Sequence, residues 1–229
     1  REDLSVGDRV TALPINPCGT CGTCVSGIPN ICLDGMKRPT PGNNSPGGYA
    51  EYISVRPDMV RRLPDTVSDK AAAMIEPASV ALHAVKKAGI KTGDRVLVTG
   101  GGPIGILCAI WAKISGASYV AITEIDLFRI NFIAENEFAD DVFNAADDGL
   151  KNKLKEVSKG GFDVAIESSA SDAGLNTTIS ALKPYGNIVV AGISFNPQQI
   201  NTLSLTTSPS VGAVITSSIG AAASTVASW

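Results

Sequence analysis

The chain has 229 residues and a formal net charge of −3 at pH 7, and hydrophobic residues make up 44% of it. At roughly 150 residues per domain, this length fits one large domain or two small ones. The hydrophobic content argues against a wholly disordered chain, and the mild acidity argues against a nucleic-acid-binding or anionic-membrane-binding surface. No charged and then apolar leader follows Arg1, so no signal peptide is visible and we expect a cytoplasmic protein.

The first part of the chain predicts short strands followed by helices. Residues 6–10 are typical of a turn that enters a strand, and residues 48–55 alternate well enough to predict a half-buried strand. A short helix is expected over residues 69–75, with Ser68 as its N-cap, and a longer one over residues 78–88.

A cluster of cysteines lies between the two expected strands. Two residues separate each of the first three cysteines, and seven separate the third from the fourth. Such gaps let a glycine-containing loop turn successive thiolates toward one centre, and four thiolates without an open position are typical of a structural tetrahedral zinc site. The expected zinc ligands are Cys18, Cys21, Cys24 and Cys32.

Three other uses of these cysteines are less consistent with their spacing. Disulfides are disfavoured because neighbours in a tight loop would compete and nothing indicates secretion. An iron–sulfur cluster usually has a short last gap and a proline after its fourth ligand, whereas Leu33 stands here. Independent redox thiols would not require four cysteines.

Two other residues with reactive side chains are better explained as packing residues. His83 lies in an apolar helix whose neighbours offer no partner for acid–base work, so we expect a structural residue. Cys108 is expected to be a small buried core residue.

From Gly89 onward the pattern alternates between strand and helix, which predicts a parallel sheet covered on both faces. The expected strands are residues 94–99, 119–123, a strand near Val142, 162–166 and 186–193, and the expected helices are residues 104–114, 150–159 and 173–183.

A glycine-rich turn over residues 100–105 follows the first of these strands and opens a helix. This context makes a G-x-G-x-x-G motif typical of dinucleotide binding. Gly100 permits the tight turn, Gly102 lets the backbone approach a pyrophosphate, and Gly105 lets helix and strand pack closely. Glu124, at the end of the next strand, can accept hydrogen bonds from the adenosine ribose. The alternative is a glycine-rich turn in another kind of α/β domain.

The last part of the chain has no charged residue after Lys183. A membrane span is disfavoured because residues 211–229 are rich in Ser, Thr, Gly and Ala rather than large aliphatic side chains. We expect strand structure up to Thr207, and then a low-complexity tail over residues 208–229 with little to bury. An artificially ended reading frame would produce such a tail.

Together these motifs resemble the zinc-containing medium-chain alcohol dehydrogenases, on the polyol (sorbitol) dehydrogenase side of that family. The likeness covers about residues 4–207. It rests on residues 6–10, the four-cysteine loop, and residues 47–52, 75–77 and 102–105.

The resemblance implies an α/β fold with three parts. Residues 1–77 would be the remnant of a GroES-like, β-rich catalytic domain, residues 78–207 a Rossmann domain with a doubly wound parallel sheet, and residues 208–229 a non-native ending. The family's last Rossmann strand, commonly used in dimerisation, falls where this tail stands.

The resemblance also implies zinc, NAD and a small-molecule alcohol or polyol substrate, with neither nucleic acid nor membrane as a partner, and a homo-oligomer in an intact member. Glu76 matches a glutamate near the catalytic zinc, whose cysteine and histidine ligands would lie upstream of Arg1, so we expect the chain alone to lack that set. The expected nucleotide-binding residues are Gly100, Gly102, Pro103, Ile104, Gly105, Glu124, Arg129, Ala191, Gly192 and Ile193.

Three functions therefore stay open. The first is a zinc-dependent oxidoreductase that passes a hydride from a secondary alcohol or polyol to NAD, present here in truncated form. The second is a non-catalytic nucleotide-binding module stapled by zinc. The third is a purely structural zinc protein in which the glycine turn is incidental.

Overall fold

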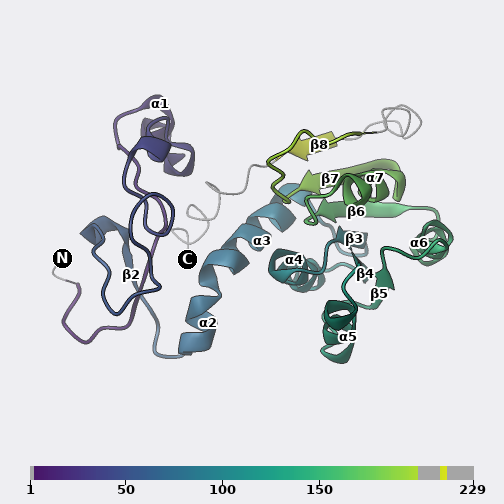
Figure 1. Cartoon of the computed structure of the whole chain (residues 1–229), viewed down its shortest axis with the longest axis horizontal. Coiled ribbons are helices and arrows are strands. Elements are labelled where there is room, and N and C mark those ends of the chain that lie inside the picture. Colours follow the sequence, from purple (N-terminus) through teal and green to yellow (C-terminus); the bar gives the residue numbers. More distant parts are fainter. Residues whose placement is uncertain (1–2, 201–211, 216–229) are drawn as a thin grey trace. The chain divides into compact units, whose positions relative to one another are not determined.

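The computed structural model describes residues 3–200 and 212–215 (Figure 1). The chain divides into two compact units, and the division falls between Ser79 and Val80. This lies two residues from the boundary expected after residue 77. Each unit is described by itself below.

The first unit contains a small antiparallel sheet in which β1 (Val10–Ala12) pairs with β2 (Val60–Arg62). Short helical turns occupy the chain between and after these strands, since proline and glycine interrupt any longer element. They are α1 (Gly22–Val25), η1 (Pro29–Ile31), η2 (Gly35–Lys37), η3 (Pro57–Met59) and α2 (Asp69–Ala73). The Oγ of Ser68 accepts a hydrogen bond from the amide of Ala71 at 3.2 Å, which confirms the expected N-cap.

The strand expected over residues 48–55 is wrong. The segment has no strand structure, and the side chains of Tyr49 and Tyr52 are 111% and 89% exposed. Alternation describes which side chains could be buried, but a strand also requires a neighbour for its backbone groups. In the described part of the first unit, β1 and β2 pair only with each other. Of residues 6–10, only Val10 belongs to a strand.

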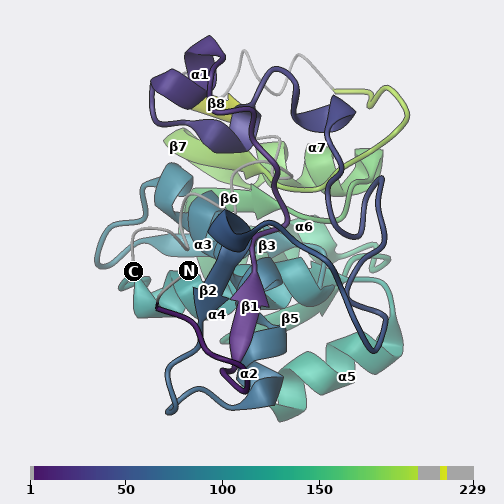
Figure 2. The ribbon, with the colours of Figure 1, turned by 90° about the vertical axis from the view of Figure 1, so that its left-hand side faces the viewer.

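The second unit is a parallel six-stranded sheet in the order β5-β4-β3-β6-β7-β8. The strands are β3 (Arg95–Thr99), β4 (Tyr119–Glu124), β5 (Asp141–Asn144), β6 (Phe162–Glu167), β7 (Leu182–Val190) and β8 (Gly212–Ile215). Figure 2 shows the labels β8, β7, β6, β3 and β5 following one another from top to bottom in this order. The order reverses between β3 and β6, which is the doubly wound arrangement expected for a Rossmann domain.

Helices cover both faces of this sheet. One apolar cluster joins the strands to α3 (Ile75–Ala88), α4 (Pro103–Ile114) and Ile133 of α5 (Leu127–Glu135). The second cluster joins them to α6 (Leu150–Ser158) and α7 (Asp172–Ser180). Figure 1 shows α4 and α6 on opposite sides of the strands. Fully buried Val96, Leu97 and Val98 alternate between the two clusters, as the two-residue period of a strand requires.

Several elements differ from those expected. α3 begins at Ile75 rather than residue 78, and α7 ends at Ser180, after which β7 starts at Leu182. α5 was not expected at all, because its apolar side chains form no clear stripe and only Ile133 is buried.

β8 lies inside the expected featureless tail, where it pairs in parallel with β7. Strand pairing uses backbone groups, so the low-complexity composition did not reveal it. Within the described ranges, no helix combines the length and apolar character that a membrane span requires.

Gly105 offers a test of the packing between β3 and α4. A Cβ at this position would lie 1.9 Å from the carbonyl oxygen of Gly100, whereas a Cβ at Gly102 would meet nothing within 4 Å. Since the obstacle is backbone, Gly105→Ala should lower the free energy of unfolding by about 2 kcal/mol or more. Urea unfolding followed by tryptophan fluorescence measures this. Gly102→Ala is the matched control and should be nearly neutral, and equal stabilities for the two variants would contradict the prediction.

Candidate functional site

The four expected zinc ligands converge in the first unit. Cys21 precedes α1, Cys24 lies within it, and Cys32 follows η1, so two short helical turns bring the ends of the loop together. One sulfur from each cysteine lies within 4.8 Å of the other three. The Sγ atoms of Cys18 and Cys24 are 3.9 Å apart, as are those of Cys21 and Cys32. Among the described residues, this is the one group of His, Cys, Asp or Glu side chains close enough to hold a metal.

These distances suit a tetrahedral zinc ion. Zn–S bonds of about 2.3 Å place the sulfur atoms about 3.8 Å apart at the corners of a tetrahedron. All five cysteines are free thiols, so the disulfide alternative is not what the structure shows. Four sulfur ligands fill the coordination sphere, which leaves no open position for a substrate.

Backbone amides point at the sulfur atoms and favour thiolates. Sγ of Cys18 accepts hydrogen bonds from the amides of Thr20 and Cys21 at 3.4 and 3.2 Å, and Sγ of Cys32 accepts one from the amide of Cys18 at 3.3 Å. Hydrogen bonding, first from the amide of Thr20, lowers the pKa of Cys18.

The pKa values of the other two thiols, those of Cys21 and Cys24, shift in opposite directions. The contact with Thr23 and the amides of Cys24 and Leu33 lower the pKa of Cys21 to about 5. Burial, together with the neighbouring thiols, raises the pKa of Cys24 to about 12. Hydrogen bonds thus favour the thiolate of Cys21, whereas burial opposes the charged form of Cys24, which a bound cation would stabilise.

In the second unit, the glycine turn lies where the sheet order reverses, at the carboxyl end of β3. Gly100 has a φ of +95°, and a Cβ there would lie 2.8 Å from the amide nitrogen of Ser169. The amides of Gly100 and Gly101 donate to the carbonyl of Thr123 and the carboxylate of Glu124, both at 2.8 Å. These two amides therefore hold the turn and are not offered to a ligand.

The next amides remain available. Gly102 is the N-cap of α4, and Pro103 has no amide hydrogen to satisfy. The amides of Gly102, Ile104 and Gly105 donate to no acceptor among the described residues. Together with the partial positive charge of a twelve-residue helix, they fit a pyrophosphate.

Glu124 lies beside this turn, and its side chain is 6% exposed. Oε1 accepts hydrogen bonds from the amides of Ile125 and Asp126 at 2.7 and 3.0 Å, and Oε2 accepts one from Gly101 at 2.8 Å. Burial by itself opposes the charged form, but these amides and the Arg129 guanidinium outweigh it and lower the pKa of Glu124. The carboxylate is therefore ionised near neutral pH and can only accept hydrogen bonds.

Arg129 pairs with this carboxylate. Its Nη1 atom lies 3.5 Å from Oε2 of Glu124, and about half of its side chain is exposed. The geometry brings together the acid and the base that would respectively disfavour and favour a 2′-phosphate.

The expected nicotinamide-side residues follow β7. The amides of Ala191 and Gly192 donate to the carbonyl of Glu167 at 2.7 and 3.0 Å, and Ile193 is 45% exposed. These positions lie at the carboxyl edge of the sheet, as the glycine turn does.

Sequence reasoning missed Glu167 itself, which is fully buried at the end of β6. Its Oε1 accepts from the amides of Ser169 and Ala170 and from the Ser169 hydroxyl, at 2.6 to 2.9 Å. Oε2 has no hydrogen-bond partner among the described residues. The sequence feature that could have pointed to Glu167 is an acidic residue at the end of a run of apolar residues. The structure places this residue where the order of the strands reverses.

Glu76 and His83 stand apart from these groups. Glu76 lies exposed in the first turn of α3, and no second described metal-ligating side chain gathers with it. Its catalytic role stays a prediction. His83 is half-buried, and burial and two nearby lysines lower its pKa, which suits a neutral packing residue. Cys108 is fully buried, as expected.

Two family models match the chain. Residues 1–65 match the alcohol dehydrogenase GroES-like domain, and residues 103–226 match the zinc-binding dehydrogenase domain. The second match extends beyond Thr207, so the expectation that the family likeness ends there is wrong.

Curated relatives agree with the family models. The chain is 30% identical to sorbitol dehydrogenase of Bacillus subtilis over 84% of its own length, and 35% identical to D-xylulose reductase A of Aspergillus niger over 83%. In both cases it spans about half of the relative, 54%.

Solved structures share the fold. A zinc-binding dehydrogenase from Sinorhizobium meliloti, solved with NADP, matches with a TM-score of 0.82 and 26% identity, over 99% of this chain and 67% of that one. An alcohol dehydrogenase from Escherichia coli, solved with NADH, matches with a TM-score of 0.83 and 26% identity, over 97% and 64%. On its domain matches and its relatives, the chain belongs to the zinc-binding, medium-chain dehydrogenase family.

Proposed function

We propose that this chain is part of a zinc-dependent alcohol or polyol dehydrogenase that passes a hydride from a secondary alcohol to NAD. The observation that carries the proposal is the carboxyl edge of the second unit, where one ionised, buried carboxylate lies together with three amides that have no acceptor among the described residues. That combination fits the pyrophosphate and ribose of a dinucleotide. The names of the sorbitol and xylulose relatives support a polyol as the substrate class.

The chain's own residues would bind and orient the reactants. The amides of Gly102, Ile104 and Gly105 would hold the pyrophosphate, and Glu124 would accept from the ribose. The backbone at residues 191–193 would lie along the nicotinamide side. A nicotinamide held there would supply the hydride acceptor, and Glu76 would be this chain's contribution to a catalytic metal site that would supply Lewis-acid chemistry.

The four-cysteine site would have a different role. Its ligand set is complete, so it would fold the loop rather than touch the substrate. Reduced thiolates of this kind suit a cytoplasmic protein, which is our proposal for its location. We also propose a homo-oligomer, which light scattering coupled to size-exclusion chromatography would test.

A second function is favoured by one observation. No described side chain gathers with Glu76 to form a second metal site. The chain by itself would then be a non-catalytic nucleotide-binding module with a cysteine loop stabilised by zinc.

Turnover distinguishes the two functions. The purified chain is given NAD and a panel of polyols, including sorbitol and xylitol, and NADH is followed by its absorbance. NADH production supports the dehydrogenase. Binding of NAD without turnover supports the module, and the absence of any binding would contradict both. Gly102→Val, which places a side chain where the pyrophosphate would approach, should abolish binding without unfolding the chain.

Metal content gives the next prediction. The chain should bind about one zinc, because one complete ligand set is present among the described residues. Cys21→Ser should release it and loosen the loop, since metal binding and local folding are coupled. Elemental analysis of the dialysed proteins measures the zinc content of the unmutated chain and of the variant. Cys108→Ser, outside the cluster, is the control, and two tightly held zinc ions per chain would contradict the prediction.

Cofactor preference gives a further prediction. The Glu124 carboxylate would face the 2′-phosphate of NADP, and we expect NAD to bind at least about a hundredfold more tightly. Glu124→Ser should relax the preference by improving NADP binding, at a cost of about 1–3 kcal/mol in stability because three amides lose their acceptor.

Calorimetric titration with both cofactors is the measurement. Arg129→Gln is the matched control, because it keeps the carboxylate and removes only the base that could reach a phosphate, so the preference for NAD should persist or grow. Equal affinities of the unmutated chain for NAD and NADP would show that Glu124 does not face the ribose.

A further inference from the structure

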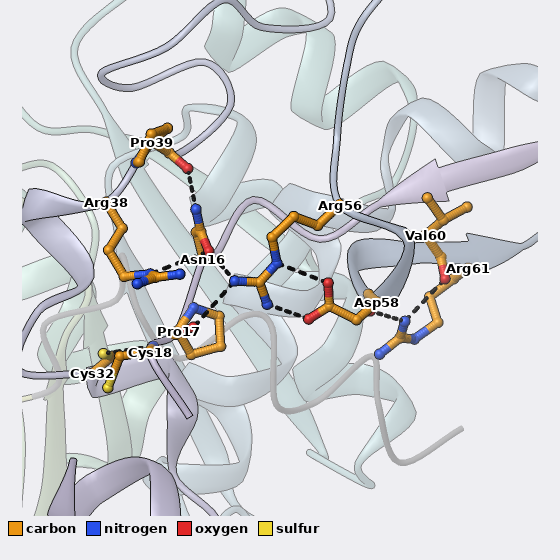
Figure 3. Close-up of polar contacts among 10 residues, drawn as sticks. All are labelled: Asn16, Pro17, Cys18, Cys32, Arg38, Pro39, Arg56, Asp58, Val60 and Arg61. Carbon is orange, nitrogen blue, oxygen red and sulfur yellow. Dashed lines mark hydrogen bonds and ion pairs between the residues drawn. The ribbon is translucent and has the colours of Figure 1, made fainter. Parts of the chain in front are cut away.

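A polar network adjoins the four-cysteine loop and is not explained by the dehydrogenase reaction. Its centre is Asn16, whose side chain is one of the few buried polar groups, at 8% exposure. Nδ2 of Asn16 donates to the carbonyl of Pro39 at 2.7 Å. Oδ1 accepts from Nη1 of Arg56 at 2.5 Å and from Nε of Arg38 at 3.4 Å. Figure 3 shows these bonds.

Asn16 therefore joins the two ends of the loop. It lies just before Cys18, whereas Arg38 and Pro39 follow Cys32. A side-chain amide that both donates and accepts across these ends holds the loop closed without using the sulfur atoms. Because the amide is buried, breaking either bond would leave a polar group unpaired, which makes the closed form costly to open.

Arg56 extends the network to one peptide group of the metal site. Its Nη1 also donates to the carbonyl of Pro17 at 3.4 Å. The same peptide group carries the amide of Cys18, which donates to Sγ of Cys32 at 3.3 Å. The guanidinium thus fixes the orientation in which this amide points at a ligand sulfur (Figure 3).

Asp58 holds Arg56 in this position. Nε of Arg56 donates to Oδ1 of Asp58 at 2.9 Å, and Nη2 bonds Oδ2, so the pair is bidentate. Both side chains are more than a third exposed, and such a pair contributes little stability by itself. Its effect here would be to restrict the guanidinium, which has no other acidic partner among the described residues.

We propose that Asn16 and Arg56 are positioning residues that preorganise the four-cysteine loop for zinc and slow the release of the metal. Groups outside the ligand set that orient the ligands typically change metal affinity by about 10–100-fold. The inference rests on the proposed zinc binding, but not on catalysis.

The test measures zinc release from the full chain. Zinc-loaded Asn16→Ala and Arg56→Met are mixed with an excess of a chromogenic chelator, and the rate of colour formation is compared with the unmutated chain. Both variants should release zinc at least about tenfold faster. Arg62→Met is the matched control, because Arg62 pairs with Asp8 at 3.4 Å and has no side-chain bond to the network or the loop among the described residues, so its rate should be unchanged.

Cobalt(II) distinguishes a loosened site from an unfolded one. Each variant loaded with cobalt should keep the absorption bands of a tetrahedral four-thiolate site while losing the metal faster. The double variant should release zinc no faster than the faster single variant, since both remove one network. Independent effects that multiply would contradict a shared network.

Two more conservative substitutions keep the test decisive if one of the first variants loses the cobalt bands. Arg56→Lys keeps the charge but cannot bond Asn16, Pro17 and both Asp58 oxygens at once, and Asn16→Asp keeps the acceptor but loses the donor to Pro39. Both should also release zinc faster. Release rates within about twofold of the unmutated chain in these four variants would overturn the proposal, and a chain that holds no zinc would overturn the metal site with it.

Discussion

Four sulfur atoms within 4.8 Å of one another impose the main physical constraint on the first unit. Thiolates this close repel one another unless a cation lies among them. The pKa shifts of Cys21 and Cys24 oppose one another because hydrogen bonds favour the thiolate at Cys21, whereas burial disfavours it at Cys24. The apolar core of this unit before Ser79 is small, with Leu13, Met59 and Leu63 buried. A metal-centred loop therefore supplies order that packing does not, as in other small metal-dependent folds.

The second unit is stabilised in the opposite way. Its sheet is buried on both faces, and its glycine turn is fixed by hydrogen bonds that the chain makes with itself. The turn can be tight because Gly105 has no Cβ, which would otherwise lie 1.9 Å from the carbonyl oxygen of Gly100. That close approach sets the N-terminus of α4 at the edge of the sheet, where its unpaired amides can meet a phosphate. Here the binding geometry is a consequence of packing and would exist before the ligand arrives.

The sequence predicted those features whose cause is local. Two-residue gaps between cysteines and a strand–glycine–helix order each fix geometry over a few residues, and both were found as expected. The misses depend on distant partners. Residues 48–55 alternate but have no strand beside them, and β8 forms on β7 despite its composition. Asn16 gave no signal, because its partners lie more than twenty residues away.

Glu124 shows why cofactor choice and loop geometry cannot be separated in this unit. The carboxylate that would read the ribose already accepts three backbone amides, one of them from the glycine turn. Because those bonds stabilise its charge, the acid stays ionised although it is buried. A substitution that admits a 2′-phosphate would also release the Gly101 amide, so the gain in NADP binding would come with a less firmly held glycine turn. Discrimination against NADP would then be a property of the whole turn, and Arg129, already paired with Glu124, would be poorly placed to reverse it.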